Sequence, residues 1–256
     1  MIRGLLVLVS GGLGAVGLLA GCAGAPEAPA PDYAAIVAAP DRSEADRETD
    51  RRRKPVELLA FTGARPSMKV LDMGAGGGYS TELLARAVAP GGIVYSQHPA
   101  GLLPNVIKAY AVRAKSAAMR NAVRMERPFE DPLPPEIGGL DLVTFFFAYH
   151  DTVHLGVDRA KMNRRLYDAL KPGGMLVLAD HSARPGDGIG VTKTLHRIEE
   201  SVVRRELEAA GFELVSEGDF LRNAADGRDA PVFKPKVPND EFVLKFRKPQ
   251  QEEKAR

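Results

Sequence analysis

The chain has 256 residues, with 35 lysines and arginines against 33 aspartates and glutamates. This near balance, with no tryptophan and no stripe of aromatic residues between basic ones, argues against nucleic acid as a partner. The densest basic run, from Asp50 to Lys54, has acidic neighbours and is typical of a solvated helix face. Without an expected leader and tether, roughly 210 residues remain, which suits one α/β domain with its own core.

The first 22 residues have the pattern of an export signal. A short basic start at Arg3 precedes an apolar run over residues 4–20, whose glycines would weaken a soluble helix but are tolerated in a secretory signal. The run ends in LAGC, which resembles the lipobox of bacterial lipoproteins, where the cysteine is lipidated and the peptide is cut before it. Cys22 is the only cysteine, so an intramolecular disulfide is excluded. An uncleaved membrane anchor or a free thiol is the alternative.

An alanine- and proline-rich segment, residues 23–40, follows the expected signal. Its prolines favour an extended, semi-rigid tether, and its lack of periodicity argues against a packed core. In lipoproteins, an aspartate directly after the cysteine implies retention at the inner membrane, and this chain has Ala23 there instead. We therefore expect an exported lipoprotein on the periplasmic side of a membrane, with the outer membrane favoured, and a folded domain over residues 41–256.

From residue 41 on, a polar helix near 41–61 is followed by apolar runs that alternate with helical patterns. This alternation predicts parallel strands joined by crossover helices. The expected strands cover residues 69–73, 93–96, 123–126, 141–147, 175–179, 213–217 and 241–247. The expected helices cover residues 80–89, 105–119, 159–170 and 198–210. The segment 222–240 has too many helix and strand breakers for a regular element and is expected to be a long loop.

The stretch DMGAGGGYS, residues 72–80, joins an expected strand to an expected helix through four glycines. Glycine allows a sharp turn and a close approach by a ligand, and the helix N-terminus adds free N–H groups. Tyr79 stands where a dinucleotide fingerprint would have its last glycine, which weakens that interpretation, and the absence of a closing lysine excludes a Walker loop. The negative charge of Asp72 would repel a phosphate but attract an ammonium group.

The segment VLDMGAGGGYSTELLA resembles motif I of class I S-adenosylmethionine-dependent methyltransferases, and GLDLV, LKPGGMLVL and EAAGFELV match later landmarks of that family in order. EGDFLRN and FVLKFRKP resemble a branch of bacterial proteins known only as predicted methyltransferases. The resemblance implies a doubly wound, mostly parallel, seven-stranded Rossmann-like α/β sheet with helices on both faces and an antiparallel last strand. It also implies S-adenosylmethionine as cofactor, its methionine part and ribose held by Asp72, Gly74, Gly76 and Gly78.

Two positions depart from the family pattern. The second strand of these enzymes commonly ends in an acidic residue that binds the ribose hydroxyls, and this chain has Gln97 and His98 there. Both can hydrogen-bond to a hydroxyl, so both are expected cofactor contacts, but neither is a carboxylate. The acidic residue that often meets the adenine amino group is also displaced, since Glu130 and Asp131 come a little late.

All five histidines follow the glycine loop, and His98, His150 and His181 stand just past expected strands. Ligands of an open α/β sheet bind outside the carboxyl ends of the strands, so these three are expected to ring one crevice. Tyr149, His150 and Asp151 occupy the position where the family has substrate and catalytic groups. We expect His150, oriented by Asp151, to act as general base in methyl transfer to a small-molecule acceptor, with Tyr149 as a further catalytic residue and no metal.

Three other interpretations stay open. A binding lipoprotein with a degenerate methyltransferase fold would explain the missing ribose carboxylate and the export signal, because the cofactor is made with ATP in the cytoplasm. A metal-dependent enzyme would use His150 and His154, four residues apart, with Asp151, Asp180 or His181 as further zinc or iron ligands. The histidines could also simply hydrogen-bond to the loop backbone, and His196 is ambiguous.

Overall fold

The computed structural model describes residue 1, residues 28–233 and residues 235–250 of the chain. The expected export signal, the expected lipidation site Cys22 and the first part of the expected tether lie outside the described residues. Within those ranges, none of the helices combines the length and the apolar character that a membrane crossing requires.

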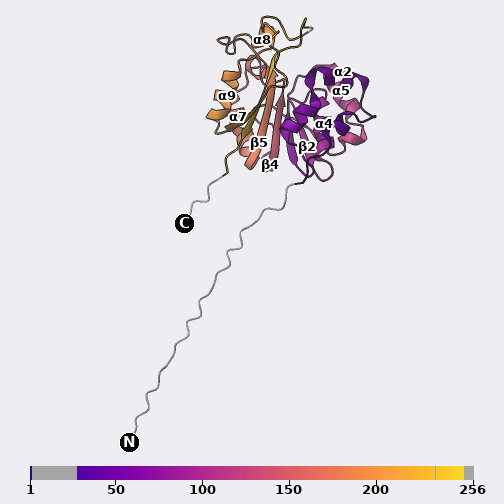
Figure 1. Ribbon diagram of the computed structural model, residues 1–256, viewed down its shortest axis with the longest axis vertical. Helices are drawn as coiled ribbons and strands as arrows, with labels where there is room; N and C mark the ends of the chain where they lie inside the picture. The colour runs from indigo at the N-terminus through magenta and orange to yellow at the C-terminus, as the bar shows by residue number, and fades with distance from the viewer. Residues whose placement is uncertain (2–27, 234, 251–256) are drawn as a thin grey trace.

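A seven-stranded sheet forms the centre of the molecule (Figure 1). Its strands are β1 Lys69–Met73, β2 Ile93–His98, β3 Ala122–Glu126, β4 Leu140–Phe146, β5 Leu170–His181, β6 Glu213–Gly218 and β7 Glu241–Arg247. They lie in the order β3-β2-β1-β4-β5-β7-β6, with β1 to β5 parallel and β7 antiparallel to both of its neighbours. The expected fold class and the antiparallel last strand are confirmed.

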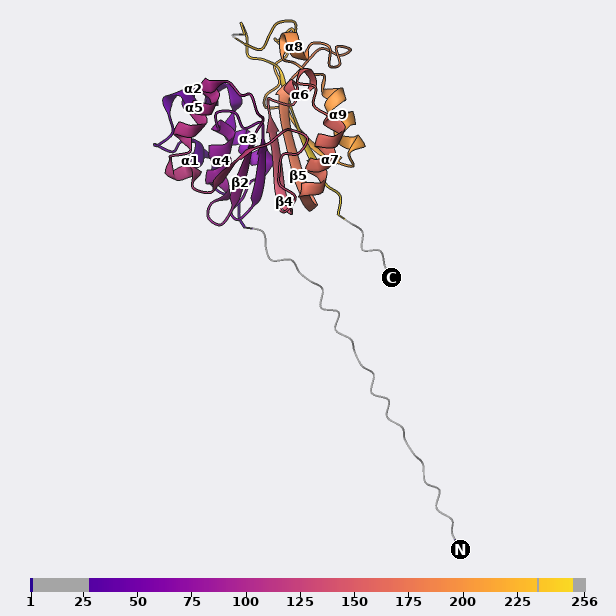
Figure 2. The same cartoon turned by 180° about the vertical axis from the view of Figure 1, so that it is seen from behind.

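Helices cover both faces of this sheet (Figures 1 and 2). One face carries α1 Tyr33–Val37, α2 Glu44–Arg53, α3 Pro55–Thr62, α4 Tyr79–Val88 and α5 Pro104–Arg113, and the other carries α7 Arg159–Ala169 and α9 Glu200–Ala209. Each face has its own apolar cluster, with Leu83 and Leu84 of α4 on one side and Leu166 and Val203 on the other. Burial on both faces explains why β1, β4 and β5 read as nearly continuous apolar runs.

Several boundaries differ from the expected ones for local physical reasons. The polar helix expected near 41–61 is two helices, because Lys54 precedes Pro55 and adopts a left-handed conformation with φ 42° instead of continuing α2. The helix expected over 105–119 ends at Arg113, and a short 3-10 turn, Ala117–Met119, follows it. β5 begins at Leu170 instead of residue 175, because the register with β4 shifts and pairs Leu170 with Leu140.

Ordered structure begins before residue 41, where the sequence places the start of the domain. Tyr33, Ile36 and Val37 belong to α1 and pack against the apolar cluster of the α4 face. The Tyr33 hydroxyl donates a hydrogen bond to the Ala64 carbonyl at 2.9 Å. Part of the expected tether is therefore folded onto the domain, because its aromatic and aliphatic side chains bury apolar surface despite the surrounding prolines.

The carboxyl ends of β4 and β5 carry a cap of short helices and loops, seen above the sheet in Figure 1. α6 Asp151–His154 follows β4, α8 Thr192–Leu195 follows β5, and the long segment 219–240 precedes β7. The long loop expected over 222–240 contains no helix or strand among its described residues. Parallel strands place their carboxyl ends at one edge, so this cap covers the edge where open α/β sheets bind ligands.

Candidate functional site

The glycine loop joins β1 to α4 through residues in the left-handed region. Gly74 has φ 60° and Gly78 has φ 82°. A Cβ at Gly74 would lie 2.8 Å from the Ala148 Cβ, and one at Gly78 would lie 2.9 Å from the Tyr110 ring. Both the backbone conformation and the available space therefore require glycine at these two positions.

Asp72, at the end of β1, is fully buried and shapes the loop. Its carboxylate accepts hydrogen bonds from the Ser80 hydroxyl at 2.8 Å, the Thr81 hydroxyl at 2.7 Å and the Thr144 hydroxyl at 2.8 Å. Burial raises the pKa of Asp72, while these donors act in the opposite direction. The expected cofactor residue thus ties the first turn of α4 and strand β4 to the loop.

Gln97 and His98 lie beside the glycine loop, but both are buried and bonded to backbone. Gln97 accepts from the Gly74 N–H at 2.9 Å and donates to the Arg127 carbonyl at 2.7 Å. The His98 ring nitrogens face the carbonyls of Ser96 and Gly76 at 3.0 and 3.1 Å, and burial lowers the pKa of His98. Their expected role as ribose contacts is at odds with this geometry, because their polar atoms already hold the loop.

Among the cavities at the carboxyl edge, two lie on either side of β1 in the strand order. The first, about 410 Å³, lies at the ends of β2 and β3 and includes Pro99, Phe129 and Glu130. The second, about 530 Å³, lies at the ends of β4 and β5, and its lining comprises Arg52, Arg53, Phe147, His150, Asp151, His181, His196, Val232, Phe233 and Pro235. We call the second one the histidine cavity. Asp131 lines neither cavity and instead pairs with Arg127 and Arg165.

Arg53 reaches the histidine cavity from the end of α2. Its guanidinium lies 4.1 Å from the centre of the Phe147 ring, and its Nε is buried without a hydrogen-bond partner in the described part of the chain. Burial, together with repulsion from Arg52, lowers the pKa of Arg53 to about 10. This position of Arg53 was not predicted from the sequence, because a basic run with acidic neighbours is usually a solvated helix face.

His150 is the buried centre of the histidine cavity. Its Nδ1 lies 2.7 Å from Asp180 Oδ1, its backbone N–H donates to Asp180 Oδ2, and its Nε2 lies 3.1 Å from Asp151 Oδ1. Burial disfavours the charged ring, but Asp180 and Asp151 outweigh it and raise the pKa of His150 to about 10. The two carboxylates thus favour the protonated ring, and the expected role of His150 as a general base stays a prediction.

Three more histidines lie near His150 and Asp151, but His98 does not. His196 Nδ1 lies 3.3 Å from both His150 Nε2 and Asp151 Oδ1. His154 Nε2 lies 3.8 Å from Asp151 Oδ1, and the His181 ring is 5.8 Å from that of His150. The expected crevice thus contains His150 and His181, whereas His98 lies under the glycine loop. The position of His196 could not be read from the sequence, because the turn after β5 determines it.

Tyr149 points away from the cavity and is fully buried in the core. Its hydroxyl donates to Glu206 Oε2 at 2.7 Å and accepts from Asn163 Nδ2 at 2.8 Å. This position conflicts with the expected catalytic role, because the hydroxyl is committed to α7 and α9 and has no path to the histidines.

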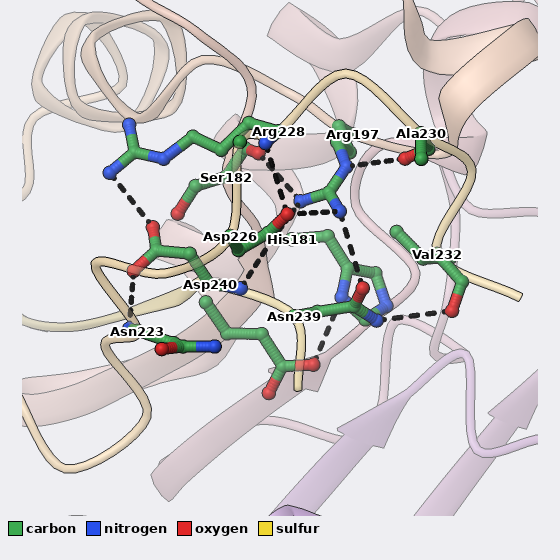
Figure 3. A network of polar contacts seen from close by, with 12 residues as sticks. His181, Ser182, Arg197, Asn223, Asp226, Arg228, Ala230, Val232, Asn239 and Asp240 are labelled. Carbon is green, nitrogen blue, oxygen red and sulfur yellow. Dashed lines mark hydrogen bonds and ion pairs between the residues drawn. The ribbon is translucent and has the colours of Figure 1, made fainter. Parts of the chain in front are cut away.

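The long loop is fastened over the histidine cavity by Arg197, which Figure 3 shows among its partners. The buried guanidinium donates to the Ala230 carbonyl at 3.0 Å and to Asn239 Oδ1 at 3.2 Å, and it pairs with Asp226 at 2.9 Å. These contacts hold both ends of the segment that brings Val232 and Phe233 to the cavity. The cavity wall is therefore built partly from a fixed loop.

Comparison of the sequence with known proteins finds a partial relative among curated proteins. A scan against protein-family models finds no match. Protein-L-isoaspartate O-methyltransferase 1 of Arabidopsis thaliana is 30% identical over 115 residues, which are 44% of this chain and 46% of that protein. The chain therefore spans less than half the length of this curated relative.

Solved structures match over more of the chain at lower identity. An S-adenosylmethionine-dependent methyltransferase from Aquifex aeolicus has a TM-score of 0.57 at 18% identity, covering 84% of this chain and 98% of its own. An arsenic(III) S-adenosylmethionine methyltransferase from Chlamydomonas reinhardtii has a TM-score of 0.56 at 17% identity, covering 87% and 75%. The cyclase SpnF has a TM-score of 0.56 at 16% identity, covering 80% and 82%. Identities this low establish the fold alone, and one fold supports different chemistries.

Proposed function

Since this chain has the fold of class I methyltransferases, we propose that it is an S-adenosylmethionine-dependent methyltransferase acting on a small-molecule acceptor. One observation carries the proposal: the glycine loop at the end of β1 lies between two cavities that open at the same edge of the sheet. S-adenosylmethionine has a flat base at one end and an amino acid at the other. A site that crosses the end of β1 fits such an elongated ligand.

Side chains in the two cavities suit the two ends of this cofactor. Pro99 and Phe129 offer apolar surface to the adenine, and Glu130 lines the same cavity. On the other side of β1, the Arg53 guanidinium has an unsatisfied buried Nε that suits the carboxylate of the methionine part. When bound, the cofactor supplies a methyl group on a sulfonium. β2 ends in Gln97 and His98, so the ribose hydroxyls would not be bound by a carboxylate at the end of this strand.

We assign the acceptor to the histidine cavity, whose volume of about 530 Å³ suits a small molecule. His150 is buried at the centre of this cavity, where its ring can hold the acceptor by a hydrogen bond. Arg52 lines the same cavity. Its positive charge favours an acceptor whose oxygen is already negatively charged, so that holding the acceptor in line with the methyl group is sufficient.

A second candidate is a binding lipoprotein that keeps the fold without methyl transfer. It is favoured by Gln97 and His98, whose polar atoms are engaged with backbone at the place where the ribose would need acceptors. Measurement of cofactor binding separates the two candidates, because the second predicts a folded protein with no affinity for S-adenosylmethionine.

The test is calorimetric titration of the full-length chain with S-adenosylmethionine and with its demethylated product. We expect micromolar dissociation constants for both, and a loss of about 10- to 100-fold in Arg53→Met, the cost of one charge-assisted hydrogen bond. Arg51→Met is the matched control, since Arg51 is exposed and pairs with Glu48 on the surface of α2.

Each outcome has a defined meaning. A folded wild-type chain that binds neither compound overturns the methyltransferase proposal in favour of the binding lipoprotein. Equal affinity in Arg53→Met and Arg51→Met would show that Arg53 does not bind the cofactor. Whether the chain binds the cofactor at all would then be decided by the wild-type titration.

A further inference from the structure

We propose that His150, Asp151 and His196 form a binding site for one divalent transition-metal ion of the zinc and iron(II) class. Their ligand atoms come from two parts of the chain, α6 with the residue before it and the end of α8. This inference goes beyond the proposed methyl transfer and does not require it, and an ion at this site would displace the proton of His150 Nε2. It also differs from the pairing suggested by the sequence, because His196 takes the place expected for His154.

The three ligand atoms form a nearly equilateral triangle. His150 Nε2 is 3.1 Å from Asp151 Oδ1, and His196 Nδ1 is 3.3 Å from each of them. Zinc bonds to nitrogen and carboxylate oxygen of about 2.1 Å place neighbouring ligand atoms about 3.0 to 3.4 Å apart, for angles between right-angled and tetrahedral. The side chains thus already have the spacing that one ion would impose.

His150 is oriented as a metal ligand by the residue beneath it. Asp180 is fully buried, accepts from the His150 backbone N–H at 2.9 Å and lies 2.7 Å from His150 Nδ1. A carboxylate at this nitrogen fixes the ring so that Nε2 faces the triangle, the arrangement common behind histidines that bind metals. Asp180 is therefore a positioning residue in this site and not one of its ligands.

His196 is held at the triangle in a left-handed backbone conformation. It ends α8 with φ 53°, and its N–H donates to the Thr192 carbonyl. Its ring also packs at 4.7 Å against Phe233, which belongs to the long loop. A non-glycine residue in the left-handed region costs about 1 kcal/mol or more, so the surroundings of His196 must hold it there.

The site is open on one side. The three ligands line the histidine cavity, with Asp151 34% and His196 27% exposed in their side chains. Two imidazoles and one carboxylate with free positions are the donor set of catalytic zinc and non-haem iron sites. An ion there would offer its free positions to a small oxyanion or a water molecule in the cavity.

The experiment uses the full-length chain, first stripped with a chelator and then titrated with Zn²⁺ or Co²⁺. Bound metal is measured by elemental analysis and by the visible absorption of Co²⁺. We expect one equivalent per chain in the wild type, and binding more than about 100-fold weaker in Asp151→Asn and His196→Gly, because removal of a ligand costs more than removal of a supporting residue. Asp168→Asn, on the exposed side of α7, is the control.

His196→Gly guards against an effect of misfolding, because glycine suits the backbone at this position. Its circular dichroism should match that of the chelated wild type. No stoichiometric binding by the wild type overturns the metal site, and so does equal binding in His196→Gly, since the ion would then be held elsewhere.

Titration with S-adenosylmethionine, with and without chelator, separates this inference from the proposed function. A chain that binds one metal ion but no cofactor keeps the metal site and loses the methyltransferase. A chain that binds cofactor but no metal keeps the methyltransferase and loses the metal site.

Discussion

Tyr149 follows β4 at a position where a catalytic residue was expected, yet its hydroxyl joins Asn163 of α7 to Glu206 of α9. Arg159 completes this group through a salt bridge to Glu206 at 2.7 Å. Tyr149→Phe should lower the free energy of unfolding by about 1 to 2 kcal/mol, because it leaves buried polar partners without their hydroxyl. Urea unfolding measures this cost, and binding of S-adenosylmethionine should not change.

Tyr167→Phe is the matched control, since the Tyr167 ring packs on Phe212 and its hydroxyl makes no hydrogen bond within the described residues. It should change stability by less than about 0.5 kcal/mol. Unchanged stability together with a loss of methyl transfer in Tyr149→Phe would return Tyr149 to the reaction.

At the residue scale, the sequence predicted side chains whose role follows from a local motif. Gly74 and Gly78 have the left-handed conformations that their spacing suggested, and Asp72 lies at the end of its strand. Arg53 and His196 were missed, because the first depends on how α2 packs and the second on a turn far from any motif. Whether the expected residues bind a cofactor stays a prediction.

At the scale of elements, charge pairs join α2 to α4 and α5. Arg113 of α5 pairs with Asp46 of α2 at 2.7 Å and also with Glu82 of α4. Burial alone would raise the pKa of Asp46, but the Arg113 guanidinium outweighs it and holds this pKa below its usual range. Since α2 also carries Arg53, these pairs help to fix one wall of the histidine cavity.

The lowered pKa of Asp46 gives the stability a pH dependence of known sign. The folded state binds a proton more weakly than the unfolded state, so the contribution of Asp46 is complete above its unfolded pKa of about 4 and is lost as pH falls through the folded value. Asp46→Asn should cost about 2 kcal/mol at pH 7 and progressively less below pH 4. Thermal unfolding between pH 2 and pH 7 measures this difference.

Glu48→Gln, which removes an exposed pair with Arg51, should leave the same pH curve unchanged. A constant difference between Asp46→Asn and wild type across the whole pH range would contradict the role of the Asp46 charge.

The elements best predicted from the sequence are those buried on both faces. β1 and β7 have the expected bounds because apolar runs between clear breakers determine them. The short helices α1, α6 and α8 were not expected, because four or five residues carry too little periodicity and are held by tertiary contacts instead. The break between α2 and α3 was in principle visible, since Pro55 restricts the residue before it.

At the scale of the whole molecule, we propose from the sequence that the chain is exported and anchored through lipid on Cys22. In a bacterial host, the full-length chain should incorporate a labelled fatty acid and sediment with membranes, and Cys22→Ala should lose the label. Ala23→Asp, with the cysteine intact, should keep the label but move the chain from the outer to the inner membrane. Label that persists in Cys22→Ala would contradict lipidation at this residue.

The place of β7 in the sheet has a consequence for the order of synthesis and folding. β7 is formed by Glu241–Arg247 but lies between β5 and β6, so the sheet cannot close until residue 247 has been made. Until then β5 and β6 each have an unpaired edge, and a nascent chain cannot reach its final hydrogen-bonding pattern. β6 can therefore join the rest of the sheet only through β7.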